Sequence, residues 1–341
     1  MGKAAAARKV ATAAAFGGGG VSLLGASLYG VLRAEARLAR NAIGNATGVP
    51  PDATGWYGKG RGGPALKIAL LGDSSAAGYG VDSVQETPGA HLASGLAEGA
   101  DRRVYLRSLA FVGAQSRDRD RQIDKALPTE PHVAVILIGA NDVTHTVLPT
   151  ESVRLLAAAV RRLLANGVEV VVGTCPDLGT IEPIPPPLKQ VARLWSRKLA
   201  AAQTVGVVQA GGRTVSLGSV LGPEFAASPK VLFGPDQFHP SAMGYSSLAA
   251  VLLPSVLAAV GVIPYDDLEP EPFRGEGVMS ITEAAVEAAR TPGTEVDASQ
   301  LDGAGAAGPL ESAGRWVLLR RRRRQPESDI ETPAESEPVT A

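Results

Sequence analysis

The sequence predicts an α/β fold in which a parallel sheet carries helices on both of its faces. Two observations lead to this prediction. Short, almost continuous apolar runs such as Val133–Ile138 recur along the chain, and they are typical of strands covered on both faces. Amphipathic helical patterns such as Ser152–Asn166 lie between these runs. Strand–helix alternation at this spacing indicates right-handed crossovers between parallel strands.

Five segments are predicted as strands. The first is an apolar run that ends at Gly72, and the second alternates between apolar and polar residues before a turn near Gly113. The third is a continuous apolar run and the fourth is another buried strand pattern, as expected for the middle of a parallel sheet. In chain order the predicted strands are Leu66–Leu71, Val104–Ala110, Val133–Ile138, Val168–Val172 and Thr214–Leu217.

Helical patterns follow these strands. Ser152–Asn166 has apolar residues at helical spacing and ends at Asn166-Gly167, which is a signal for a helix C-terminus. Pro240 lies near the first turn of the last long helix, a position that tolerates proline. The predicted helices are Pro88–Ala97, Arg117–Leu127, Ser152–Asn166, Leu188–Thr204 and Ser241–Val260, with a short one at Ile281–Arg290.

The composition divides the chain into four segments. We expect an N-terminal hydrophobic segment over 1–45, a linker over 46–63, the α/β domain over 64–264 and a tail over 265–341. From Asp266 onwards the tail has 16 acidic and 8 basic residues, whereas the whole chain has a net charge of −1. Because the tail is acidic and rich in Pro, Gly and Ala, we expect most of it to be disordered.

Two segments suggest contact with a membrane. Residues 10–32 carry no charge, lie between basic residues and have the length of one membrane crossing, so we interpret them as an uncleaved anchor. The alternatives are a cleaved secretory signal and an Ala/Gly-rich helix packed on the domain. In the tail, Trp316–Leu319 and Arg320–Arg324 combine an apolar wedge with a basic cluster that suits anionic lipid, or form a solvated charge run. We expect a membrane-associated or cell-envelope location, with a cytoplasmic one left open.

The composition also excludes several classes of protein. A net charge of −1 argues against a nucleic-acid partner. The single cysteine, Cys175, excludes an internal disulfide and is assigned no role. Four scattered histidines do not form a metal-binding pattern, and no P-loop or G-x-G-x-x-G motif follows a strand. The sequence therefore predicts neither a metal nor a nucleotide cofactor.

Polar residues and glycines follow the first three predicted strands. Gly72-Asp73-Ser74 places Ser74 at a strand-to-helix turn, where backbone N–H groups favour negative charge. Gly113, which lets a backbone N–H approach a ligand, follows the second strand, and Gly139-Ala140-Asn141-Asp142 follows the third. Ligands bind at the carboxyl ends of parallel strands, so these residues are candidates for a site. Each of them alone also fits an ordinary turn.

Asp236 and His239 precede the last long helix. An aspartate three residues before a histidine can accept a hydrogen bond from Nδ1–H, which leaves Nε2 free to act as a base. The alternative is a surface turn before a helix start. Of the other histidines, His145 is the only competitor by position, because it lies three residues beyond Asp142.

Together and in this order, the four blocks resemble the SGNH hydrolase family, also called GDSL-type esterases and lipases, over about residues 66–260. The resemblance implies a three-layer α/β/α sandwich with a flavodoxin-like sheet, and hydrolysis of carboxylic esters without a cofactor. It implies that Ser74 is the nucleophile, His239 the base and Asp236 the residue that orients the base. It also implies an oxyanion hole formed by the N–H groups of Ser74 and Gly113 and the amide of Asn141.

Some details depart from this pattern or lie outside it. Ser75-Ala76-Ala77 stands where many members of the family have Leu or Thr, which should affect the pocket wall, and Ser75 would be the nucleophile if the motif were shifted by one. Asp73 and Asp142 are expected to brace their loops. The proline-rich loop Pro176–Pro187 should be stiff and form one wall of the substrate pocket.

The sequence therefore predicts a serine esterase or lipase that acts on a small-molecule or lipid ester. An SGNH-type deacetylase or acyltransferase acting on cell-envelope glycan is an alternative with the same fold. A non-catalytic scaffold associated with a membrane is an alternative of a different class. Product analysis with glycan and lipid esters separates the first two, and labelling of Ser74 by a fluorophosphonate separates both from the third.

Overall fold

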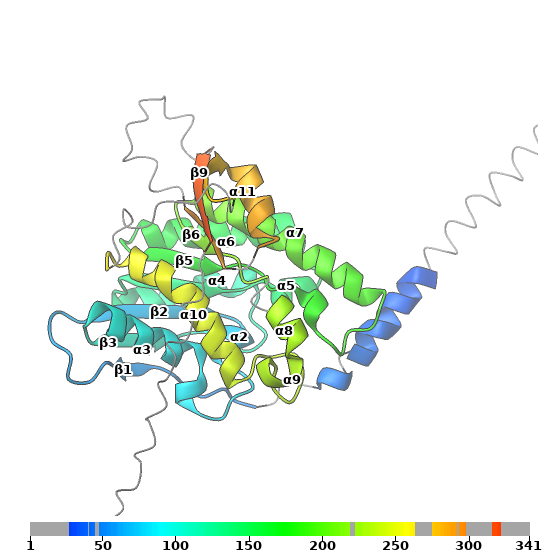
Figure 1. The fold of residues 1–341 in the computed structure, drawn as a ribbon, viewed down its shortest axis with the longest axis horizontal. Helices are drawn as coiled ribbons and strands as arrows, with labels where there is room; N and C mark the ends of the chain where they lie inside the picture. The colour runs from blue at the N-terminus through cyan, green and yellow to red at the C-terminus, as the bar shows by residue number, and fades with distance from the viewer. Residues whose placement is uncertain are drawn as a thin grey trace, which may run out of the picture.

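A computed structural model of the chain places a central sheet between layers of helices (Figure 1). It confirms the α/β fold predicted from the sequence. The residues described by the structure are 27–39, 41–44, 48–218, 222–262, 275–291, 293–297 and 316–321.

Five parallel strands form the middle of the sheet. They lie in the order β3-β2-β4-β5-β6, which is the strand order of flavodoxin-like folds. Their bounds differ by at most two residues from those predicted. The strands are β2 (Leu66–Gly72), β3 (Val104–Ser108), β4 (Val133–Leu137), β5 (Glu169–Gly173) and β6 (Arg213–Val215).

The sheet separates two apolar cores, which is why its strands read as continuous apolar runs. In β2, Ile68 and Leu70 enter the core formed with α3 and α10, whereas Ala69 and Leu71 enter the core formed with α4 and α6. All four side chains are buried. The long helices, each predicted within a few residues, are α3 (Pro88–Ala100), α4 (Arg119–Ala126), α6 (Pro149–Leu164), α7 (Leu188–Gln209) and α10 (Ala242–Ala259).

Short helices occupy several connections, and the sequence predicts none of them. Four or five residues contain too little periodicity to indicate a helix. The α-helical ones are α2 (Ser74–Ala77), α5 (Ala140–Thr144), α8 (Pro223–Ala227) and α9 (Pro229–Leu232). The 3₁₀ turns are η1 (Val84–Glu86), η2 (Ser116–Asp118), η3 (Leu127–Thr129) and η4 (Leu178–Thr180).

Antiparallel strands extend the parallel sheet at both edges. β1 pairs with β3 on one side, and β8 pairs with β6 on the other, followed by β9 and β7. The sheet therefore extends beyond the expected domain boundaries at 64 and 264. The added strands are β1 (Gly55–Tyr57), β7 (Gly277–Ser280), β8 (Thr294–Asp297) and β9 (Trp316–Arg321).

The described parts of the tail form regular elements, among them a helix close to the one predicted at Ile281–Arg290. With α11 (Ile281–Ala288), the strands β7, β8 and β9 form a third apolar core against Val208 of α7. The exposed fractions of Val317 and Leu319 are both 0% and that of Trp316 is 53%. The segment Trp316–Leu319, which the sequence suggests as a membrane contact, is therefore mainly a buried strand, because Val317 and Leu319 of β9 face this core. The remainder of the tail, including residues 322–324, lies outside the described residues.

The predicted membrane anchor lies largely outside the described residues. Residues 27–39 are helical, and the exposed side chains of this helix include Leu28 and Tyr29. Among the described residues, the only helix with the length and apolar composition of a membrane span is α10, and 56% of it is buried inside the protein. Its Leu248 and Leu252 belong to the core beside α3, so we assign α10 to the interior of the domain.

Candidate active site

The predicted site residues lie in the connections that follow the carboxyl ends of the parallel strands. Ser74 is the first residue of α2, directly after β2 and its cap Asp73. Gly113 lies in the loop after β3, and Asn141 lies in α5 after β4. His239 lies in the loop before α10, together with Asp236. The parallel strands end at one edge of the sheet, and the loops meet there.

The structure joins Ser74, His239 and Asp236 in one chain of hydrogen bonds. The Oγ atom of Ser74 lies 2.9 Å from Nε2 of His239. The Nδ1 atom of the same ring lies 2.6 Å from Oδ2 of Asp236. The serine and the histidine are 165 positions apart in the sequence, and both are buried. This arrangement can move a proton from the hydroxyl to the imidazole.

Asp236 is held by its own loop. Its Oδ1 atom accepts hydrogen bonds from the backbone N–H groups of Phe238 and His239, at 3.0 and 2.9 Å. Burial alone would raise the pKa of the Asp236 carboxyl, but the hydrogen bonds from His239 hold it below its ordinary value. The carboxylate therefore stays ionised beside the ring.

Two aromatic rings enclose the imidazole. The ring centroid of Tyr79 lies 4.6 Å and that of Phe238 lies 4.8 Å from the centroid of His239. Tyr79 is fixed in turn, because its carbonyl oxygen accepts a hydrogen bond of 2.6 Å from the hydroxyl of Tyr245. The ring of His239 is thus positioned by packing as well as by Asp236.

The competing residues have other partners. Nδ1 of His145 lies 2.9 Å from the carbonyl oxygen of Asn141, and this histidine is exposed. The backbone N–H of Ser75 donates to Oδ1 of Asp73 at 3.0 Å, while the hydroxyl that contacts His239 belongs to Ser74. The geometry therefore favours Ser74 and His239 over both alternatives.

Asp73 caps the helix that begins at Ser74, as expected of a residue that braces this loop. It is almost fully buried. Burial raises the pKa of its carboxyl to about 6, although the N–H of Ser75 and the guanidinium of Arg119 act in the opposite direction. Arg119 is also buried, and burial lowers the pKa of its guanidinium to about 10.

Asp142 braces the loops that carry the two other site blocks. Its carboxylate accepts hydrogen bonds from the N–H of Ser116 at 3.0 Å and from its hydroxyl at 2.5 Å. The hydroxyl of Ser152 donates to the same carboxylate at 2.6 Å. These bonds tie the loop after β3 to α5 and α6, which confirms the expected bracing role.

Gly113 and Asn141 face the same cavity as Ser74. Gly113 has a φ of +83°, a conformation that favours glycine. The side-chain nitrogen of Asn141 donates one hydrogen bond of 3.1 Å to the carbonyl oxygen of Ala114. An amide nitrogen has two N–H groups, so the other is available to a ligand.

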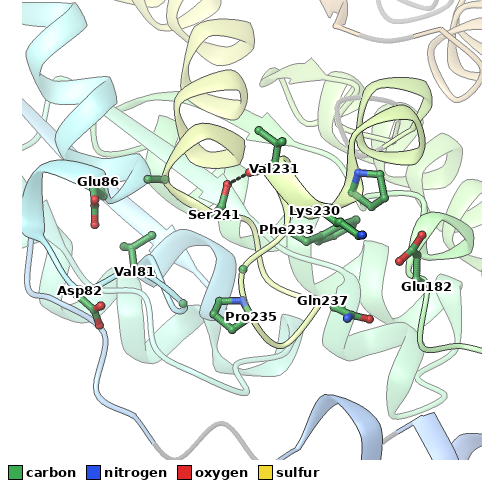
Figure 2. Close-up of a pocket in the computed structure, with 14 residues that line it drawn as sticks. Val81, Asp82, Glu86, Glu182, Lys230, Val231, Phe233, Pro235, Gln237 and Ser241 are labelled. Atoms are coloured by element: carbon green, nitrogen blue, oxygen red, sulfur yellow. Dashed lines mark hydrogen bonds between the residues drawn. The ribbon is translucent and has the colours of Figure 1, made fainter.

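The cavity that contains Ser74 has a volume of about 520 Å³ and an unexpected wall. The wall includes Ile43, Gly44 and 48–50, which the sequence places in the N-terminal segment and the linker. The expected wall, the loop Pro176–Pro187, does not line this cavity. Its Glu182 lines a neighbouring cavity of about 530 Å³, which shares Gly80–Asp82 and Pro235 with the first (Figure 2).

Two residues behind the site escaped prediction, although the sequence contains a signal for them. Arg119 and Gln122 are buried on the same face of α4 as Ile123 and Ala126. The spacing i, i+3, i+4, i+7 therefore places two polar residues on an apolar face, which marks them as partners of other buried groups.

The described residues contain no group of three or more His, Cys, Asp or Glu side chains that could hold a metal ion. Cys175 is buried, and burial raises the pKa of its thiol well above its ordinary value. A thiol in this state is a poor nucleophile.

Comparison with known proteins identifies the family. The GDSL-like Lipase/Acylhydrolase family matches residues 70–246, more than half of the chain. The GDSL-like esterase Rv1075c of Mycobacterium tuberculosis is 43% identical over 256 residues, which cover 72% of this chain and 80% of that protein. Among solved structures, TesA matches with 19% identity and a TM-score of 0.47, over 57% of this chain and 99% of TesA. A lipase/acylhydrolase from Enterococcus faecalis matches with 19% identity and a TM-score of 0.44, over 57% of this chain and 96% of that one.

The matched residues include Ser74, Asn141, Asp236 and His239, and they span the five parallel strands from Leu70 of β2 onwards. The sequence blocks, the strand order and the family match thus agree. The chain belongs to the GDSL-like lipase/acylhydrolase (SGNH hydrolase) family, and it is an ester hydrolase.

Proposed function

We propose that the protein hydrolyses carboxylic esters with Ser74 as nucleophile, His239 as general base and Asp236 as the residue that orients the base. One observation carries the proposal. The Ser74 hydroxyl lies within hydrogen-bond distance of Nε2 of His239 while Nδ1 of the same ring contacts Asp236. In this tautomer Nε2 is free to accept the hydroxyl proton.

The reaction then has two halves. Oγ of Ser74 attacks the ester carbonyl carbon as its proton moves to Nε2 of His239, and the carbonyl oxygen becomes an oxyanion. When the carbonyl re-forms, the alcohol leaves with the proton from His239, and the acyl group remains on Ser74. A water molecule, deprotonated by the same ring, attacks the acyl-enzyme, and the acid is released as the proton returns to Ser74.

The oxyanion requires donors that are in place before the reaction. We assign this role to the backbone N–H groups of Ser74 and Gly113 and to the side-chain amide of Asn141, all of which lie at the same cavity. The hydrogen bond from Asn141 to the carbonyl of Ala114 fixes the amide, so no reorganisation is needed when charge develops.

Fluorophosphonate labelling and ester turnover test the nucleophile. The purified full chain should become labelled on Ser74 and should hydrolyse short-chain aryl esters, and Ser74→Ala and His239→Ala should each abolish turnover. Ser75→Ala is the matched control, because it removes the neighbouring hydroxyl and keeps the N–H that contacts Asp73. Undiminished turnover by both Ser74→Ala and His239→Ala would refute the proposal.

Asp236→Asn tests the orienting role separately. The amide keeps the size of the carboxylate but cannot hold the ring in the same tautomer, so we expect kcat to fall by about 10³–10⁴-fold with little change in the folded structure. A loss of less than tenfold would assign the orientation of His239 to its aromatic neighbours instead.

The uncharged segment 10–32 is proposed as a membrane anchor that holds the esterase at the membrane. The proposal is supported by its length and its basic flanks. In fractionated cells the full chain should sediment with membranes, and replacing Leu23 and Leu24 by aspartate should release it. The intact mass of the purified protein distinguishes an uncleaved anchor from a removed secretory signal.

A further inference from the structure

We infer that Ile43, Gly44, Gly48, Val49 and Pro50, here called the N-terminal strap, form the part of the active-site cavity that receives the hydrocarbon chain of the ester substrate. This inference rests on the proposed function, because it takes Ser74 as the group that attacks the ester. The strap lies outside residues 70–246, the part of the chain that the family match covers.

The strap shares one cavity with the reacting groups. The cavity of about 520 Å³ is lined by all five strap residues and also by Ser74 and His239. A substrate whose carbonyl lies at Ser74 therefore extends from it within reach of the strap. None of the five strap residues is charged.

Val49 is the strap residue whose apolar side chain the protein covers least. Its exposed fraction is 93%, the highest among the large apolar side chains that the structure describes as exposed. Val112 and Phe238, which are half-buried, line the same cavity. A hydrocarbon chain that lies among these side chains would bury apolar surface that otherwise contacts water.

Residues on either side of the strap contact the domain. Before it, Oε2 of Glu35 accepts a hydrogen bond of 2.8 Å from the N–H of Leu188 at the start of α7, and Ala39 is buried in the main core. After it, Ala53 is buried in the same core, and its carbonyl oxygen accepts a hydrogen bond of 2.7 Å from the hydroxyl of Tyr57 in β1.

The ring of Tyr79 lies near both Gly48 of the strap and the imidazole of His239. A Cβ atom at Gly48 would lie 3.6 Å from Cε2 of Tyr79, so the strap backbone runs over this ring. The centroid of the same ring lies 4.6 Å from that of His239. Tyr79 therefore connects Gly48 of the strap with the base of the proposed reaction.

The expected size of the effect follows from hydrophobic burial. Full burial of one methylene group favours binding by about fourfold. The cavity is open on one side, so we expect about twofold per methylene. The hydrocarbon chain could belong to the acyl group or to the leaving alcohol, and both chains have the same apolar chemistry. The experiment therefore needs one series of esters for each.

The test measures kcat/KM for two ester series with the full chain and with Val49→Asp. One series runs from p-nitrophenyl acetate to hexanoate, and the other from ethyl to hexyl acetate. In the wild-type protein kcat/KM should rise about twofold per methylene in one series. Val49→Asp should lower kcat/KM for the longest ester of that series about tenfold more than for the shortest ester, through KM. Val49→Ala should give an intermediate loss.

Val278→Asp is the matched control, because Val278 is also an exposed valine but lies on β7 at the far edge of the sheet. It should leave the dependence on chain length unchanged. An equal loss for short and long esters in Val49→Asp, or no loss in either series, would overturn the inference. Turnover that survives in Ser74→Ala would instead refute the proposed nucleophile, so the two failures are distinguishable.

Discussion

The side chain of Gln122 holds the peptide groups of Gly72 through two hydrogen bonds. Its Oε1 atom accepts from the N–H of Gly72 at 3.1 Å, and its Nε2 atom donates to the carbonyl oxygen of Gly72 at 2.9 Å. Gly72 is the last residue of β2, has a φ of +153°, and lies two positions before Ser74. A helix on one face of the sheet thus fixes the strand end that presents the hydroxyl.

Gln122→Leu should therefore destabilise the protein and impair turnover together. It leaves the buried N–H of Gly72 without this acceptor, while the carbonyl oxygen keeps the N–H of Phe111 at 3.3 Å, and we expect the free energy of unfolding to fall by about 1–3 kcal/mol. Urea denaturation and ester kinetics measure both effects. Gln85→Leu removes an exposed glutamine and is the control. If kcat in Gln122→Leu stays at the wild-type value, the strand end is held by its other contacts.

Asn141→Ala tests the oxyanion hole. If the amide donates to the oxyanion, its removal should lower kcat by about 10²–10³-fold and change KM little, because the interaction forms mainly in the transition state. Thr144→Ala, in the same short helix and exposed, should stay within twofold of wild type. An effect of Asn141→Ala on KM alone would assign the residue to substrate binding.

Asp73 should make stability depend on pH in a characteristic direction. Burial raises the pKa of its carboxyl from 3.8 to about 6, so the folded protein holds this proton more tightly than the unfolded chain. The stabilisation from the bound proton is complete below pH 4 and is lost as the pH rises to about 6, with a total of about 3 kcal/mol. Asp73→Asn should lack this decrease. Parallel curves for the two proteins between pH 4 and 7 would contradict the assignment.

Removal of the ordered part of the tail should destabilise the domain. A chain that ends at residue 262 loses the third core and uncovers Val208, and it removes the ion pairs that the buried Arg213 forms with Glu295 and Asp297. We expect the melting temperature to fall by about 5–10 °C. A chain that ends at Arg321 keeps all these elements and should melt within about 2 °C of the full chain. Equal melting temperatures for both truncations would show that the tail adds no stability.

The sequence predicts the centre of the fold well because its strands are buried on both faces. In β4, all five residues are buried, and a run of this kind fits few other environments. The site is predictable for a related reason. The residue types at the carboxyl ends of successive strands indicate one location, and the structure brings Ser74 and His239 to hydrogen-bond distance there.

The strands at the edges of the sheet and the wall of the cavity could not be predicted from the sequence. β1 has three residues, and β7 and β8 have four, so alternation in them is too short to recognise. Residues 48–50 have the composition of a linker, and yet they line the cavity. Contacts between distant parts of the chain, such as the hydrogen bond from the N–H of Leu188 to Glu35, hold this region against the domain, and sequence patterns do not reveal such contacts. The prolines in the loop 176–187 indicate that this loop is stiff, but they do not indicate which cavity it lines.

The sheet order has one more consequence, for the behaviour of the folded protein at high concentration. An uncovered strand edge can pair with a second molecule and start aggregation. Here β1 covers the outer edge of β3 and β8 covers that of β6, so the five parallel strands have no free edge within the described residues. The outermost strands, β1 and β7, have only three and four residues. Strands this short are poor templates for pairing with a second molecule.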